Sequence, residues 1–242
     1  MSANGSPVAL ITGAAGGLGR AAVARLRERG MRVVATDLAL AEIPCGAPLM
    51  VASVDVTDES TVNAIIERVR SEYGRLDHVI HLAGVAGQGP LEAVSLKDWN
   101  RLLEVNLTSA FLIAKAAHAA LRESRGSLVL ASSTNGLNGG SALSGPAYAV
   151  AKAGLINFAR YLANEWAPDG IRVNCLAPGP IKTPMVTGRF SAEVLAGLQE
   201  LVPLGRLGEP EQVAHAIDYL TSSSAGFVTG TVMNVSGGVV LD

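Results

Sequence analysis

Short apolar runs alternate along this chain with longer segments in which apolar residues recur at helical spacing. The apolar runs predict seven strands, at Val8–Thr12, Arg32–Thr36, Leu49–Val54, Leu76–Leu82, Ser127–Ala131, Arg172–Leu176 and Thr231–Val235. The helical spacing predicts helices at Gly17–Arg29, Glu59–Glu72, Ser95–Arg122 (continuous or broken) and Tyr148–Ala167. Apolar strands that alternate with helices indicate an α/β fold, namely a single Rossmann-type, doubly wound, seven-stranded parallel sheet with helices on both faces.

The sequence contains no linker, repeat or low-complexity segment, so residues 1–242 are expected to form a single domain. Residues 1–7 have the composition of a frayed N-terminal tail. Residues 183–205 lack a strand pattern and are expected to form an inserted helical lid over a substrate site.

Composition excludes several classes of function. A formal net charge of −2 gives no reason to expect a nucleic-acid partner, and no apolar run reaches the length of about 20 residues that a membrane helix needs. The N-terminus lacks the features of a signal peptide, so a cytoplasmic location is expected. The thiols of Cys45 and Cys175 have no metal-type spacing. His78 and His81 share one side of a strand without a Cys or carboxylate partner, so no metal is expected.

A glycine-rich turn joins the first strand to the first helix. Glycines there let the backbone approach a pyrophosphate, and the helix N-terminus offers it free N–H groups and the positive end of a dipole. The spacing differs from the G-x-G-x-x-G of many dehydrogenases, so the position between strand and helix carries the prediction. The residues expected to bind the phosphates are Thr12, Gly13, Gly17, Leu18 and Gly19.

Asp37 ends the second strand, where its carboxylate can accept hydrogen bonds from the hydroxyls of an adenosine ribose. It would repel a 2′-phosphate, and Leu38 supplies no cation for one, so the sequence favours NAD. Asp55 and Val56 follow the third strand and are expected to flank the adenine. For Asp37 a helix-cap or turn role is the alternative, and for Asp55 a turn-forming role is the alternative.

Tyr148 and Lys152 stand four residues apart on a predicted helix, so both point from one face about 6 Å apart along the axis. A nearby ammonium and the positive charge of oxidised nicotinamide would favour the phenolate and lower the tyrosine pKa. The phenol could then exchange a proton with an alcohol or ketone oxygen. Ser133 follows the fifth strand, at the edge of the sheet where ligands bind in such folds. An exposed helical pair is the alternative for the tyrosine and lysine.

These residues resemble the compact, single-domain branch of the short-chain dehydrogenase/reductase family, from Val8 to Gly238. The matching motifs are Thr12-Gly13-x-x-x-Gly17-x-Gly19, Asn106 in Val105-Asn106-Leu107, Ser133, Tyr148-x-x-x-Lys152 and Pro178-Gly179-Pro180-Ile181-x-Thr183. The chain is also similar to the family in Asn174 and in its closing glycines, Gly230, Gly237 and Gly238.

The resemblance implies a single NAD(P)-binding domain and a role for each matched residue. Tyr148 would be the acid/base, and Lys152 would bind the nicotinamide ribose and lower the tyrosine pKa. Ser133, with Ser132 as fallback, would stabilise the substrate oxygen, and Asn106 would support a proton-relaying water. For Asn106 the alternative is a side chain that satisfies helix backbone. The remaining cofactor-binding residues would be Ala83, Gly84, Pro178, Gly179, Ile181 and Thr183.

One position departs from the family. Its Asn-Ala-Gly after the fourth strand is Leu82-Ala83-Gly84 here, preceded by His81. The family asparagine braces the central sheet, so its replacement by Leu82 puts the local geometry in doubt.

The sequence therefore predicts an NAD-dependent oxidoreductase that transfers a hydride to or from a secondary alcohol or ketone. A 3-oxoacyl-thioester reductase and a non-catalytic NAD-binding sensor or scaffold are the alternatives. The apolar lid favours an apolar or ring-containing substrate, while Arg189 and Lys182 leave room for a carboxylate or an acyl carrier. We also expect a homotetramer, or at least a dimer, in which Phe158 and Leu162 form an apolar mating face unless they pack inward.

Overall fold

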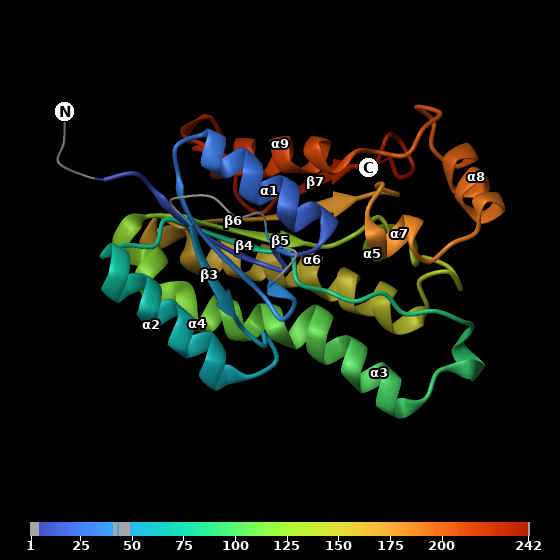
Figure 1. Ribbon diagram of the computed structural model, residues 1–242, viewed down its shortest axis with the longest axis horizontal. Coiled ribbons are helices and arrows are strands. Elements are labelled where there is room, and N and C mark those ends of the chain that lie inside the picture. Colours follow the sequence, from blue (N-terminus) through green and yellow to red (C-terminus); the bar gives the residue numbers. More distant parts are fainter. Residues whose placement is uncertain (1–4, 41–42, 44–48, 242) are drawn as a thin grey trace.

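Seven parallel strands form the central sheet, in the order β3-β2-β1-β4-β5-β6-β7 (Figure 1). The computed structural model describes residues 5–40, 43 and 49–241. The strands are β1 (Val8–Thr12), β2 (Arg32–Asp37), β3 (Leu49–Ser53), β4 (His78–His81), β5 (Ser127–Ala131), β6 (Arg172–Pro178) and β7 (Val232–Val235). The strand order reverses direction between β1 and β4, which is where ligands bind in doubly wound sheets. The predicted fold class is confirmed.

Helices cover both faces of the sheet (Figure 1). One face carries α1 (Gly17–Glu28) and α9 (Pro210–Thr221), and the other carries α2 (Glu59–Tyr73), α4 (Ser109–Ser124) and α6 (Pro146–Trp166). A π-helical turn, Glu104–Thr108, joins α3 (Leu96–Leu103) to α4. The shorter helices are α5 (Asn135–Asn138), α7 (Pro184–Thr187) and α8 (Ala192–Glu200).

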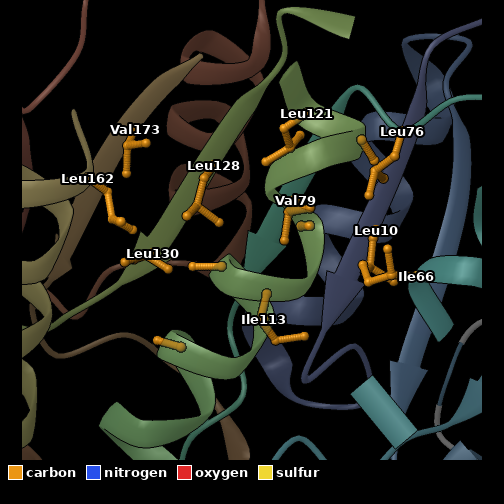
Figure 2. Packing of buried hydrophobic residues seen from close by; sticks show 14 of the residues in the cluster. Leu10, Ile66, Leu76, Val79, Ile113, Leu121, Leu128, Leu130, Leu162 and Val173 are labelled. Carbon is orange, nitrogen blue, oxygen red and sulfur yellow. The ribbon is translucent and has the colours of Figure 1, made fainter. Parts of the chain in front are cut away.

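Burial on both sides explains why the strands are apolar at consecutive positions. Leu10 and Ile11 are neighbours on β1 and belong to two different core clusters, because successive strand side chains point to opposite faces. Leu10 packs with Val79 and Ile113 in the layer beneath α2, α4 and α6 (Figure 2). Ile11 packs with Ile217 in the layer beneath α1 and α9. No helix among the described residues combines the length and the hydropathy that crossing a membrane requires.

One feature differs from the sequence prediction, and a second decides between two alternatives that the prediction left open. The helix α9 was not predicted, although Pro210 at its first turn and the capping box of Glu209 and Gln212 mark its start. The predicted helix from Ser95 is broken by the π-helical turn, which apolar periodicity does not reveal. Its cap is as expected, because the Asp98 amide donates to Ser95 Oγ at 3.0 Å.

The expected mating face is not formed by the residues named for it. Leu162 is buried and Phe158 packs against the core, so both point inward. The exposed large apolar side chains of α4 and α6 are Phe111, Val150 and Tyr161 instead. The homotetramer stays a prediction. Of the two cysteines, Cys175 is buried and Cys45 lies outside the described residues.

His81 braces the sheet where the family asparagine is absent. Its Nδ1 lies 2.8 Å from Thr12 Oγ1 on β1, and its Nε2 lies 3.0 Å from Ser109 Oγ on α4. Because Ser109 Oγ donates its proton to the Val105 carbonyl at 2.7 Å, it must accept from Nε2–H. Nδ1 then accepts from Thr12, so the imidazole is neutral. Leu82 packs against the core below α1, and its amide still donates to the Thr12 carbonyl at 3.1 Å.

Burial lowers the pKa of His81 from 6.5 to about 3, so the folded state requires the neutral ring. The neutral His81 ring contributes fully to the free energy of unfolding above pH 6.5, and this contribution is lost as the pH falls toward 3. Between pH 7 and pH 5 the wild type should lose about 2 kcal/mol of unfolding free energy through this residue. In urea unfolding experiments, His81→Leu should lose less unfolding free energy than the wild type between pH 7 and pH 5, because this ionisation is absent. His215→Leu, which removes an exposed imidazole, should keep the wild-type loss, and an unchanged loss in His81→Leu would contradict the assignment.

Candidate active site

The carboxyl ends of the strands bring most of the sequence motifs to one cleft. This cleft has a volume of about 360 Å³. Its lining includes ten residues expected to bind the cofactor, which are Gly13, Gly17, Leu18, Gly19, Asp37, Asp55, Val56, Ala83, Gly84 and Thr183. Motifs that are up to 170 residues apart in the chain therefore meet because parallel strands all end at the same edge.

The glycine turn is as tight as its sequence predicts. Gly13 has a φ of +68°, and a Cβ there would lie 2.6 Å from the Ala83 amide nitrogen. A side chain at Gly19 would clash with the Gly13 carbonyl, and one at Gly17 would lie 2.7 Å from Thr183 Cγ2 across the cleft. Gly16 caps α1 without a side-chain hydrogen bond, so the first amides of the helix point at the cleft. This backbone has the shape and polarity of a phosphate cradle.

Asp37 is held at the rim of the cleft by backbone amides. Its Oδ2 accepts from the Ala15 amide at 3.0 Å, and its Oδ1 accepts from the Ala39 amide at 3.2 Å. Both oxygens keep further acceptor capacity for hydroxyl groups. Leu38 next to it is 67% exposed and presents no charge. Asp55 accepts from the amide and hydroxyl of Thr57, so it forms the turn that was its alternative role while still lining the cleft.

Tyr148 lies in the first turn of α6, opposite Ser133 at the end of β5. Burial raises the pKa of Tyr148, and a hydrogen bond with Ser133 and the positive charge of Arg189 oppose that rise. The net direction is upward, so the prediction of a lowered pKa is wrong for the chain by itself. The Lys152 ammonium is 5.5 Å from the centre of the tyrosine ring.

Lys152 is buried beneath the cleft on the same face of α6. Its Nζ donates to the Ala131 carbonyl at the end of β5, at 2.7 Å. Burial lowers the pKa of this ammonium to about 8. Within the described part of the chain, no carboxylate pairs with it. The structure therefore holds a protonated lysine at neutral pH by a carbonyl hydrogen bond and the nearby tyrosine ring, with donors left for a ligand.

Asn106 is fully buried in the π-helical turn. Its Nδ2 donates to the carbonyls of Leu102 and Val85 at 3.0 and 2.9 Å, and its Oδ1 accepts from the Val85 amide at 3.2 Å. The side chain thus satisfies backbone groups of its own helix and of the segment after β4. A Cβ at Gly84 would lie 2.7 Å from Asn106 Oδ1 and 3.4 Å from Lys152 Nζ, so Gly84 keeps the space between those two groups open.

The two serines after β5 face different ways. Ser132 Oγ donates to the Lys152 carbonyl at 2.7 Å and is buried against α6. Ser133 is only partly buried, and its Oγ accepts from the Asn135 amide at 3.2 Å. Because Ser133 is partly exposed and acts on the pKa of Tyr148, while Ser132 is buried and engaged with α6, Ser133 is the better placed of the two to meet a substrate.

Six of the expected cofactor residues are not among those that line the cleft, namely Tyr148 and Lys152, described above, and Thr12, Pro178, Gly179 and Ile181. Thr12 lies beneath the glycine turn and bonds His81. Pro178 accepts from the Thr134 amide at 3.0 Å, and Gly179 packs so closely on Ser236 that a Cβ would lie 2.8 Å from its Cα. Ile181 pairs with Gly208 at the base of the lid. These last three shape the segment that brings Thr183 to the cleft.

Sequence reasoning missed several lining residues. Leu38, Val54, Arg101 and Met185 also line the cleft. Arg101 is one helical turn before Val105, but nothing in the apolar pattern shows that α3 runs along the cleft. No group of three or more potential metal ligands exists among the described residues.

Comparisons with known proteins agree with this geometry. A family model described as enoyl-(acyl carrier protein) reductase matches residues 13–240. The 3-oxoacyl-[acyl-carrier-protein] reductase of Escherichia coli (strain K12) is 37% identical over 243 residues, covering 97% of each chain. The cis-4-hydroxycyclohexanecarboxylate dehydrogenase of Sinomonas cyclohexanicum is 40% identical over 241 residues, covering 96% of this chain and 95% of that protein.

Solved structures match over the whole chain as well. A 3-ketoacyl-(acyl-carrier-protein) reductase from Brucella melitensis complexed with NADH has a TM-score of 0.91 at 27% identity, covering 98% of this chain and 99% of that one. A putative short-chain dehydrogenase/reductase from Burkholderia xenovorans has a TM-score of 0.90 at 33% identity, covering 99% of both. The chain thus belongs to the short-chain dehydrogenase/reductase family, and it is an oxidoreductase that acts on keto or hydroxyl groups with a nicotinamide cofactor.

Proposed function

We propose that this enzyme transfers a hydride between NAD(H) and the carbon of a secondary alcohol or ketone, with Tyr148 as general acid/base. The observation that carries the proposal is the placement of Tyr148 beside Ser133 at the carboxyl edge of the sheet, one helical turn from the buried Lys152. When bound, the nicotinamide cofactor supplies or accepts the hydride. The chain supplies the proton and holds the reacting oxygen.

Each side chain has a separate task in this proposal. In oxidation, the Tyr148 oxygen takes the proton of the alcohol as its carbon loses the hydride. In reduction, the Tyr148 hydroxyl gives that proton back to the carbonyl oxygen. Ser133 donates a hydrogen bond to the same oxygen, where negative charge develops. The raised pKa of Tyr148 keeps the phenol protonated in the chain alone, which suits proton donation to a ketone.

Lys152 and Asn106 assist Tyr148 and Ser133 from the buried side of the site. Lys152 has one N–H engaged with Ala131 and two more donors for the ribose hydroxyls of the cofactor. Its positive charge, with that of oxidised nicotinamide, favours the phenolate that oxidation requires. We assign the open space beside Gly84, between Asn106 Oδ1 and Lys152 Nζ, as the place of a proton-relaying water.

The residues at the other end of the cleft fit NAD(H). The turn Gly13–Gly19 and the N-terminus of α1 would hold the pyrophosphate, Asp37 the adenosine ribose, and Asp55 and Val56 the adenine. A 2′-phosphate beside Asp37 would meet a like charge, with only Leu38 as the next side chain. A cytoplasmic location is part of the same proposal.

A 3-oxoacyl-thioester reductase is the second candidate, and the likeness to the Escherichia coli acyl-carrier-protein reductase favours it. The likeness to a hydroxycyclohexanecarboxylate dehydrogenase is equally extensive and favours a small ring alcohol. The proximity of Ser133, Tyr148, Lys152 and Asn106 at the carboxyl edge of the sheet argues against a non-catalytic NAD-binding scaffold.

Removal of the Tyr148 hydroxyl tests the proton-transfer role. Tyr148→Phe keeps the ring and its packing, so kcat should fall by roughly 10²–10⁴ while NADH affinity changes little. Tyr161→Phe is the matched control, because Tyr161 lies on the same helix and is 62% exposed. Steady-state rates and NADH fluorescence titrations measure both quantities. Near wild-type turnover in Tyr148→Phe would remove this residue from the mechanism.

The charge of Asp37 should set the cofactor preference. Asp37→Asn keeps an acceptor for the Ala15 amide but removes the charge that repels a 2′-phosphate. The ratio of kcat/KM for NAD(H) to that for NADP(H) should exceed one in the wild type and fall by about 10-fold in Asp37→Asn. Asp55→Asn, with the same charge removed elsewhere in the cleft, should change the ratio little. A wild-type preference for NADP(H) would overturn the assignment.

A further inference from the structure

Arg189, a positively charged residue of the lid (residues 183–205), contacts the segment that follows β4. Arg189 follows α7, and its guanidinium Nη2 donates to the Gly87 carbonyl at 2.8 Å, across 102 positions of sequence. The guanidinium also lies over the ring of Phe190, with Cζ 5.3 Å from the ring centre. The side chain is thus held by a hydrogen bond and a cation–π contact although the residue is exposed.

The segment that Arg189 contacts lies next to the residues that precede α6. The segment Val85–Gly89 is bonded to Asn106 at one end, and at the other the Gly89 amide donates to the Ala142 carbonyl at 2.8 Å. A Cβ at Gly87 would lie 2.8 Å from the Ser144 carbonyl, four residues before Tyr148. Arg189 is therefore bonded to a segment that packs against the residues leading into Tyr148.

The charge of Arg189 has no acidic partner within the described residues. By contrast, Lys182 at the base of the lid pairs with Glu209 at 2.5 Å. A guanidinium has five N–H donors in a planar fork, and the Gly87 carbonyl engages one of its nitrogens. The positive charge also lowers the pKa of Tyr148 against the effect of burial, so it acts on the tyrosine hydroxyl.

We propose that Arg189 binds the carboxylate of the substrate, so that the enzyme acts on a hydroxy acid or oxo acid whose carboxylate is separated from the reacting carbon by a ring or a short chain. This inference rests on the proposed function, because it places the carboxylate relative to the oxygen held by Tyr148 and Ser133. A fork of N–H donors matches the two oxygens of a carboxylate, and such charge-assisted pairs are stronger than neutral hydrogen bonds. Phe190 and Met185, which belong to the same lid, supply apolar surface for the carbon skeleton.

The test compares two ligands of one shape on the NADH-loaded enzyme. Cyclohexanecarboxylate and cyclohexanecarboxamide are titrated into the protein–NADH complex, with binding measured by calorimetry. The wild type should bind the carboxylate more tightly than the amide. Arg189→Gln should weaken carboxylate binding by roughly 10- to 100-fold and leave amide binding within about 3-fold. Arg206→Gln is the control, because Arg206 also donates to a backbone carbonyl, at 3.2 Å, and should leave both affinities unchanged.

Two results would overturn the inference. Equal binding of the carboxylate and the amide by the wild type is the first, and equal weakening of both ligands in Arg189→Gln is the second. If Arg189→Gln instead slowed the reduction of acetoacetyl-coenzyme A and spared carboxylate binding, the lid cation would serve an acyl carrier and the proposal would be wrong.

Turnover separates this inference from the proposed function. The wild type should oxidise 4-hydroxycyclohexanecarboxylate with NAD and prefer it to 4-hydroxycyclohexanecarboxamide in kcat/KM. Arg189→Gln should abolish that preference, and comparison of the two substrates at one pH cancels any change in the Tyr148 pKa. Arg189-dependent carboxylate binding without turnover of any alcohol or ketone would leave the carboxylate site standing and refute the hydride-transfer proposal. Turnover of the acid and the amide at equal kcat/KM would support hydride transfer and refute the carboxylate site.

Discussion

The burial of one ammonium group governs how this active site is assembled. Lys152 is 4% exposed, and among the described residues its ammonium donates to the Ala131 carbonyl instead of pairing with a carboxylate. An isolated buried charge is costly, so the end of β5 and the first turns of α6 must stay in register for that hydrogen bond to form. Ser132 Oγ adds a second link by donating to the Lys152 carbonyl. Gly136 allows the approach, because a Cβ there would lie 2.6 Å from the Lys152 carbonyl carbon.

The same register places Tyr148. The tyrosine is one helical turn before the lysine, so the contacts that hold Lys152 also hold the phenol beside Ser133. Burial acts on the two groups in ways that complement each other, because it raises the pKa of the tyrosine and lowers that of the lysine to about 8. The remaining N–H donors of this buried lysine can bind a ligand that offers hydrogen-bond acceptors, and the ribose hydroxyls of the cofactor are such acceptors.

Much of this arrangement follows from local sequence rules, and the exceptions have physical causes. The strands, the glycine turn, Asp37 and the Tyr148–Lys152 pair are encoded in short segments, so periodicity, turn chemistry and family resemblance predict them. The π-helical turn around Asn106 was not predictable, because it depends on hydrogen bonds to Val85 in another segment. The brace at His81 uses Thr12 and Ser109 from two other elements. The rise in the Tyr148 pKa reflects burial in the folded chain, which helical spacing alone does not report.

If the protonated form of Lys152 binds the cofactor, NADH affinity must depend on pH through the ionisation of this lysine. Calorimetric titration between pH 7 and pH 9.5 should show wild-type affinity falling by roughly 10-fold or more as Lys152 loses its proton through a pKa of about 8. Lys152→Met should bind NADH more weakly at pH 7 and show little dependence on pH over the same range. Affinity that stays constant in the wild type, or that falls equally in Lys152→Met, would contradict the account.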